Sequence, residues 1–155
     1  MSKSLTRVRN ALIAAGIEPD IREVGQARTA QEAADSVGCA LDQIAKSIIF
    51  RGEESGEALL FLTAGGNQVN AAKASAIAGE ALGKADAALI RSQTGFAIGG
   101  VAPVGHLSPI RAWLDPRLHE FDVIWAAAGT PRHVFALDPG TLLSLTGALE
   151  GDFTD

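Results

Sequence analysis

The histidines, the carboxylates and the cysteine are the first candidates for chemistry, and they form no recognisable catalytic set. His106, His119 and His133 lack the spacing of metal ligands, and no serine has the flanking glycines of a nucleophile elbow. The clustered glutamates fall within residues 53–57, a polar turn in which a solvated role is expected. Cys39 is the single cysteine, which excludes an internal disulfide and predicts a small buried side chain. These residue types alone indicate no nucleophile, base or metal centre.

A glycine-rich stretch at residues 95–106 is the second candidate, because backbone N–H groups without side chains can cradle an anion. It does not end in the Gly-Lys-Ser/Thr of an ATP-binding loop. It also lacks the later glycines and the following helix of a dinucleotide fingerprint. Its irregular pattern predicts a shaped loop beside a strand, and a simple bulge or turn is the alternative.

Lys46 is the third candidate, because it is one of only four lysines and lies between apolar stretches. One helical turn is expected at residues 42–45, and residues 47–51 are rich in strand formers. We therefore expect Lys46 at a helix-to-strand junction. A solvated lysine at a helix end is the simplest interpretation of the residue alone.

Short helices and hairpins must position these candidates. Helical spacing predicts a first helix over about residues 4–15, followed by Gly16. Thr29 and Glu32 match a capping box, in which each side chain accepts the other residue's backbone N–H, and this begins a helix that Gly38 ends. Capping and apolar patterns predict further helical segments at 71–78, 85–92, 116–120 and 139–146, and strands at 19–24, 47–51, 58–64, 110–114, 123–127 and 133–137.

This order of elements lacks the regular strand-helix alternation of a doubly wound sheet. We predict an α+β fold in which one mixed, mainly antiparallel sheet is surrounded by short helices. The 155 residues suit a single domain spanning 1–155, with no internal repeat or linker.

Composition restricts the class of protein. A chain that is 47% hydrophobic and 20% charged is expected to fold. A net charge of −5 argues against a protein that coats nucleic acid without specificity, so any RNA contact must be local. No apolar run is long enough to cross a bilayer, and the first residues lack the core of a secretion signal. We expect a cytoplasmic protein with neither a membrane nor DNA as a partner.

Two motifs together, residues 43–50 and 94–106, resemble the YbaK/prolyl-tRNA synthetase-associated editing family. The spacing from Gly99 to Pro103 matches the family's G-x-x-x-P loop. The similarity covers nearly the whole chain, including the Thr29 helix, Asp115 and the turn at 128–129.

The resemblance implies a trans-editing hydrolase that deacylates mischarged aminoacyl-tRNA without a metal or cofactor. The implied substrate is tRNA(Pro) carrying a small wrong amino acid, such as Ala, Ser, Thr, Cys or 2-aminobutyrate, and the implied partners are the 3′ acceptor end and prolyl-tRNA synthetase. In this interpretation Lys46 holds the terminal phosphate or the substrate, and the Gly99–Gly100 backbone contacts the aminoacyl group while water attacks the ester with help from a ribose hydroxyl. The residues expected to bind substrate are Ser47, Ala97, Val101, Ala102, Pro103, Thr130 and His133, although His133 also fits a structural role.

The chain departs from the YbaK subtype at residues 129–133, where Gly-Thr-Pro-Arg-His replaces the subtype's Gly-Lys-Arg-Gly. Cysteine specificity therefore cannot be carried over. Two other functions stay open: a non-catalytic module that binds tRNA ends or a synthetase, and a small-ligand binding protein that uses the glycine loop.

Overall fold

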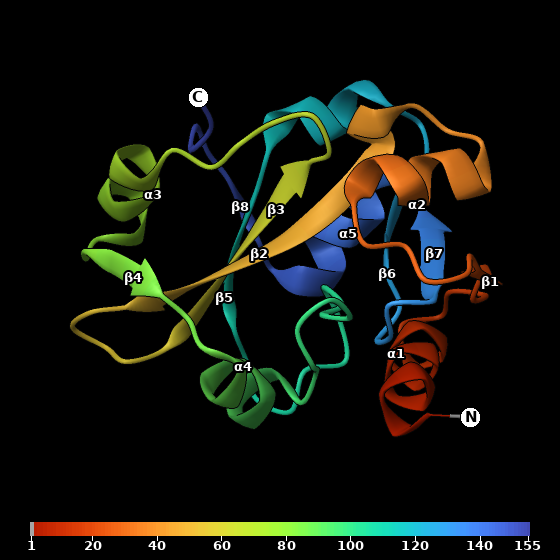
Figure 1. The fold of residues 1–155 in the computed structure, drawn as a ribbon, viewed down its shortest axis with the longest axis horizontal. Helices are drawn as coiled ribbons and strands as arrows, with labels where there is room; N and C mark the ends of the chain where they lie inside the picture. Colours follow the sequence, from red (N-terminus) through yellow and green to blue (C-terminus); the bar gives the residue numbers. More distant parts are fainter. Residues whose placement is uncertain (1) are drawn as a thin grey trace.

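One mixed sheet runs through the protein in the computed structural model, which describes residues 2–155 (Figure 1). Its strand order is β1-β7-β6-β2-β3-β5-β8. Strand β4 lies off this path and pairs with the C-terminal end of β2, whereas β6 pairs with its start. The strands are β1 (Ile21–Glu23), β2 (Ile44–Gly52), β3 (Ala58–Ala64), β4 (Leu82–Lys84), β5 (Arg111–Leu114), β6 (Ile124–Ala127), β7 (His133–Leu137) and β8 (Leu149–Glu150). The helices are α1 (Lys3–Ala14), α2 (Ala30–Val37), α3 (Ala71–Ala78), α4 (Ala87–Thr94) and α5 (Pro139–Thr146), with 3₁₀ turns η1 (Leu41–Gln43) and η2 (Pro116–Glu120).

The sheet is mixed. Antiparallel pairs join β1 to β7, β6 to β7, and β2 to both β3 and β4. Parallel pairs join β2 to β6, β3 to β5 and β5 to β8. This arrangement confirms the expected α+β class with a mixed sheet.

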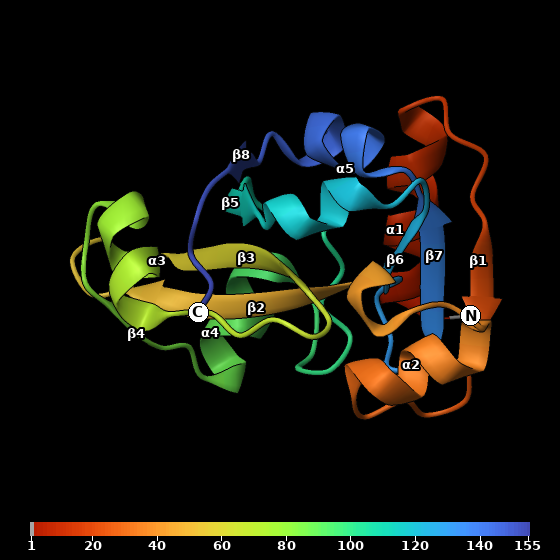
Figure 2. The same cartoon turned by 90° about the horizontal axis from the view of Figure 1, so that it is seen from above.

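Strand β3 is buried on both faces, because its side chains alternate between two apolar clusters. Leu60 and Leu62 belong to the larger cluster, to which α1 contributes Leu5, Val8 and Leu12. Figure 2 shows α1 beside β6 and β7, away from α3 at the far end of β2 and β3. Helical spacing in α1 therefore gives one apolar stripe that packs on the sheet.

On the opposite face of β3, Leu59 and Phe61 meet the small residues of α3. Phe61 stacks on Trp113 with ring centroids 4.9 Å apart and makes an edge contact with Phe153. The central hairpin is thus fixed from both sides.

Most expected elements are confirmed to within a few residues, including the hairpins and the proline-initiated turn and helix. The expected position of Lys46 at a helix-to-strand junction was wrong. Lys46 lies inside β2 and pairs with Thr63 of β3. The reason is that the backbone becomes extended at Ile44, directly after η1 ends at Gln43. The two-residue and three-residue strands β8 and β4 were not anticipated.

The capping box at α2 differs in one partner. Thr29 Oγ1 accepts the Glu32 N–H at 3.1 Å as expected, but the Glu32 carboxylate accepts the N–H of Arg28 at 3.2 Å rather than that of Thr29. Cys39 was expected to be buried but is only half-buried, and this partial burial raises the pKa of its thiol. Among residues 2–155, no helix has the length and apolar character needed to span a bilayer.

Candidate active site

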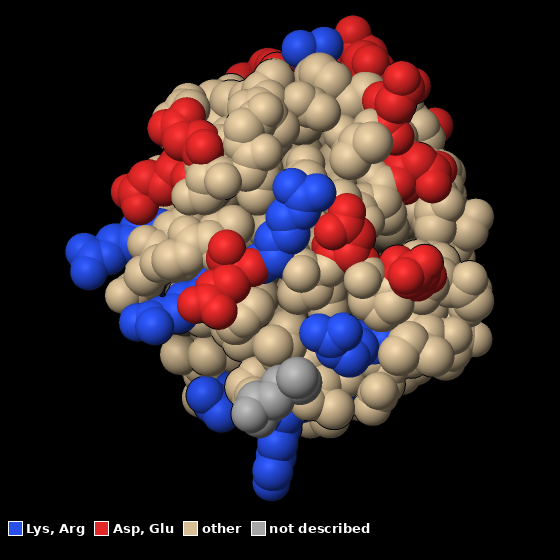
Figure 3. All heavy atoms as spheres, turned by 90° about the vertical axis from the view of Figure 1, so that its right-hand side faces the viewer, with Lys and Arg blue, Asp and Glu red and all other residues tan. Residues whose placement is uncertain are grey.

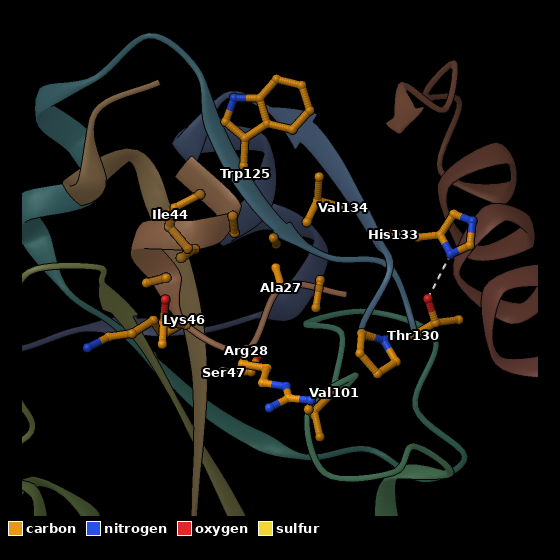
Figure 4. A pocket seen from close by; sticks show the side chains of 18 residues that line it. Ala27, Arg28, Ile44, Lys46, Ser47, Val101, Trp125, Thr130, His133 and Val134 are labelled. Carbon is orange, nitrogen blue, oxygen red and sulfur yellow. Dashed lines mark hydrogen bonds between the residues drawn. The ribbon is translucent and has the colours of Figure 1, made fainter. Parts of the chain in front are cut away.

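A cavity of about 180 Å³ lies beside a short segment of β2 that pairs with no strand of residues 2–155 on one edge (Figure 4). On that edge β2 pairs with β6 only at Ile44 and Ala45, and with β4 only from Phe50 onward. The strand segment between them, which begins at Lys46, is therefore open to other groups. The cavity is lined by residues of four segments: Ala27, Arg28, Thr29, Ala30 and Ala33; Ile44, Ala45, Lys46 and Ser47; Gly99 and Val101; Trp125, Ala126, Ala127, Thr130, Pro131, His133 and Val134.

The cavity has an apolar interior and a polar rim. Ala45, Ala126 and Val101 are 2%, 1% and 7% exposed, whereas Arg28 and Gly99 are exposed. A volume of about 180 Å³ is smaller than the roughly 300–1,000 Å³ of a site for a drug-sized ligand. The cavity therefore suits a small group with the rest of its ligand outside.

The glycine loop forms one wall by packing against the β6–β7 turn. A Cβ at Gly100 would lie 2.9 Å from Thr130 Cα, so only glycine permits this approach. The Gly100 N–H donates to Ala97 O at 3.0 Å and is thus used within the loop. Among the described residues no backbone partner is found for the N–H groups of Gly99 and Val101, so the loop itself does not use them.

Lys46 on β2 forms part of the cavity wall, and its ammonium is hydrogen-bonded to a residue that does not line the cavity. Nζ donates to the carbonyl oxygen of Asn67 at 2.6 Å, and in Figure 4 the ammonium end is turned away from Thr130 and His133. Burial lowers the pKa of Lys46, while the nearby charges of Asp115 and Asp42 act in the opposite direction. One N–H of the ammonium is used in this way, and the other two stay available.

Asp115 organises the segment that holds Lys46. Its buried carboxylate accepts the Asn67 Nδ2 group at 2.8 Å, the Ala64 N–H at 3.1 Å and the Arg117 N–H at 3.0 Å. Arg117 Nε also reaches Asp42 at 3.0 Å. The lysine is therefore positioned by a hydrogen-bonded network behind the cavity.

Ser47, Thr130 and His133 also line the cavity, as expected from the sequence. Ser47 Oγ is buried and has no hydrogen-bond partner among the described residues. Thr130 Oγ1 and His133 Nδ1 are hydrogen-bonded at 2.7 Å, and Figure 4 shows the imidazole directed away from the cavity. This bond ties the β6–β7 turn together, so the Ser47 hydroxyl is the more available polar group.

Three further residues expected at the site lie elsewhere. Ala97 is exposed, and neither it nor Ala102 or Pro103 lines this cavity. Ala102 is fully buried in the main core, and its carbonyl lies 2.7 Å from His106 Nε2. Pro103 lines a separate cavity of about 440 Å³ with His106. Gly100, expected at the catalytic centre, does not line this cavity either, because it packs against the Thr130 backbone. Within the G-x-x-x-P segment, Gly99 and Val101 are the residues that line the Lys46 cavity.

Sequence reasoning missed Arg28, Trp125 and the alanines contributed by α2 and β6. A cation directly before the Thr29 cap was a usable signal for Arg28, but alanines and a tryptophan give no such signal. No group of three or more potential metal ligands occurs among residues 2–155.

The fold and this site define an aminoacyl-tRNA editing domain. The model of the aminoacyl-tRNA editing domain family matches residues 24–145, and the chain belongs to this family.

The chain is also similar to individual proteins. The uncharacterized protein YwhH of Bacillus subtilis (strain 168) is 31% identical over 140 residues, which cover 90% of this chain and 88% of YwhH. The crystal structure of a "putative trans-editing enzyme for prolyl tRNA synthetase" is 44% identical, with a TM-score of 0.93 over 100% of this chain and 99% of that one. The hypothetical protein APE2540 shares the fold, with a TM-score of 0.87 at 24% identity over 96% of this chain and 99% of its own.

Proposed function

We propose that this protein is a trans-editing deacylase, which hydrolyses the ester of a small wrong amino acid on the 3′ end of tRNA, with tRNA(Pro) as the preferred carrier. The observation that carries the proposal is the small cavity lined by both Lys46 and Gly99, one from each sequence motif. The solved relative that is described as a trans-editing enzyme for prolyl tRNA synthetase supports the choice of tRNA and of that synthetase as partner.

The chemistry requires little from the protein. An aminoacyl ester is already activated, so a site that orients water and substrate supplies much of the rate. No carboxylate lines the cavity among the described residues, and its titratable side chains are Arg28, Lys46 and His133. Water attacks the carbonyl with help from a ribose hydroxyl, while cationic and N–H groups stabilise the developing oxyanion.

The residues of the cavity and its glycine loop have distinct roles toward the aminoacyl ester. The ammonium of Lys46 turns from the Asn67 carbonyl toward the cavity and stabilises the developing oxyanion of the ester. The backbone N–H groups of Gly99 and Val101 face the acyl group. Ser47 Oγ, buried without a partner, gains one when substrate enters. Gly100 keeps the loop against the turn rather than donating its own N–H.

The cavity favours small acyl groups because most of its apolar lining is alanine. Pocket size separates acyl groups by only about 1–3 kcal/mol per methylene. Alanine, serine, threonine, cysteine and 2-aminobutyrate therefore all belong in the substrate panel.

The test is deacylation of tRNA(Pro) charged with each of these amino acids. We expect Lys46→Ala to reduce the rate by about a hundredfold, as loss of one oxyanion-stabilising group does elsewhere. Lys84→Ala removes an exposed lysine on β4 that does not line the cavity and should retain the wild-type rate.

Three results would contradict the proposal. Equal rates for wild type and Lys46→Ala would remove the site from the reaction. Saturable tRNA binding without turnover would indicate a non-catalytic module for tRNA ends, and tight binding of a free nucleotide or amino acid with indifference to tRNA would indicate a small-ligand protein.

A further inference from the structure

Arg28 lies at the rim of the Lys46 cavity and belongs to neither sequence motif. Its side chain lines the cavity together with Thr29, and the residue is exposed. Figure 4 shows the guanidinium extending toward Val101 on the glycine-loop side. A long cationic side chain therefore stands where a ligand would leave the cavity.

The backbone of Arg28 is fixed even though its side chain is exposed. The Glu32 carboxylate accepts the Arg28 N–H, and the Thr29 hydroxyl in turn accepts the Glu32 N–H. Ala27 on the other side packs against the apolar cluster of α2, β6 and β7. The guanidinium thus starts from an anchored position, which reduces the entropy lost when it binds.

The two cationic side chains of the cavity, Arg28 and Lys46, differ in the partners that surround them. Lys46 is bonded to the Asn67 carbonyl and feels the charges of Asp42 and Asp115. For the Arg28 guanidinium, no hydrogen bond or ion pair is found within residues 2–155. Its five N–H donors are therefore available to an anion.

The surface that the described residues form around the cavity offers a nucleic acid no broad region of positive charge. On the side that carries β1 and α1, basic and acidic residues are interspersed without a broad basic patch (Figure 3). The net charge of the chain is −5. A nucleic acid would therefore depend on individual cations near the cavity rather than on a general positive surface.

The chemistry of an aminoacylated 3′ end identifies the anion. Its carboxyl group is esterified and its amino group is cationic, so the backbone phosphates carry all of its negative charge. A cavity of about 180 Å³ holds the acyl group and leaves the adenosine outside, which brings the preceding phosphate to the rim. A guanidinium matches a phosphate with two parallel hydrogen bonds.

We propose that Arg28 binds the phosphate that precedes the terminal adenosine and so positions the ester against the glycine loop. This inference rests on the proposed function and adds a substrate contact to it. Lys46 is then left to act on the ester rather than on that phosphate.

Two esters of the same amino acid test this contact. One is the 3′ ester of adenosine, which has no phosphate, and the other is the 3′ ester of cytidylyl-(3′→5′)-adenosine, which has one. Arg28→Ala should lower kcat/KM for the dinucleotide ester by about tenfold more than it lowers kcat/KM for the adenosine ester. Arg28→Lys should keep part of the preference for the dinucleotide ester over the adenosine ester. Arg91→Ala removes an exposed arginine on α4 and should keep all of this preference.

Binding of uncharged adenosine and cytidylyl-adenosine gives a measurement that does not require turnover. Wild type should prefer the dinucleotide, the preference should weaken as salt rises, and Arg28→Ala should abolish it. Equal losses on both esters, or a wild-type protein without a preference for the dinucleotide, overturns the role of Arg28. Absence of turnover with an intact, Arg28-dependent preference instead contradicts the deacylase function and leaves the phosphate contact standing.

Discussion

The ammonium of Lys46 is hydrogen-bonded to the main-chain carbonyl of Asn67 at 2.6 Å, across the end of the β2–β3 hairpin. The Asn67 side chain is itself bonded to the buried Asp115 carboxylate. The lysine of one motif is thus positioned by a residue after β3 and by the cap of η2.

Asp115→Ala should destabilise the fold. The substitution leaves the buried Ala64 N–H without an acceptor, which costs about 1–3 kcal/mol, and also frees the Asn67 amide. The free energy of unfolding in urea measures this loss. Asp152→Ala is the control, because its exposed pair with Lys73 should contribute at most about 1 kcal/mol. Equal stability of the two variants would show that the Asp115 network is unimportant.

Gly100→Ala tests the contact between the glycine loop and the β6–β7 turn. The new Cβ would lie 2.9–3.1 Å from the Thr130 backbone, so the loop or the turn must shift. Overpacking of this kind costs about 1–3 kcal/mol, and we expect lower deacylation as well as a lower midpoint of thermal unfolding.

A second glycine supplies the matched control. Gly140 lies in the first turn of α5, where a Cβ would meet only the Asp138 side chain at 3.3 Å. Gly140→Ala should change the free energy of unfolding by at most about 1 kcal/mol in either direction, because the Asp138 side chain that caps α5 must shift slightly while the unfolded chain loses freedom. If Gly100→Ala were as stable and as active as Gly140→Ala, the close packing of loop and turn would have no role.

Local signals were sufficient to predict most of the fold. The caps Thr29, Asn70, Asp115 and Asp138 each accept a backbone N–H at the start of the expected helix or turn. By contrast, the short strands β4 and β8 depend on partners distant in sequence, since two or three residues carry no periodicity. Their existence follows from tertiary pairing rather than local preference.

The candidate site was predicted only in part, because it too depends on tertiary contacts that the local sequence does not encode. Motif spacing identified Lys46 and Gly99, which line one cavity. It did not separate Val101, which faces the cavity, from Ala102, which is buried in the core, because the direction of a side chain in an irregular loop is set by packing. Arg28 precedes the Thr29 cap, which was a local signal, but its approach to the cavity depends on the packing of α2 against β6, which the local sequence does not encode.

His106 should make the stability of the fold depend on pH. Its Nε2 is bonded to the Ala102 carbonyl at 2.7 Å, and its Nδ1 is buried without a partner among the described residues. Burial, together with the positive charge of Arg7, lowers the pKa of His106 below its ordinary range. Protonation is therefore less favourable in the folded chain than in the unfolded one.

The direction of the effect follows from proton binding. Below the ordinary histidine pKa of about 6.5 the unfolded chain takes up a proton that the folded chain resists, so the free energy of unfolding falls as the pH falls. For one such group the slope cannot exceed about 1.4 kcal/mol per pH unit. Urea unfolding at pH 7.5 and pH 5.5 measures it, and His106→Gln should show a smaller decrease than the wild type. An identical decrease in both proteins would mean that the titration of other groups, rather than of His106, governs stability in this range.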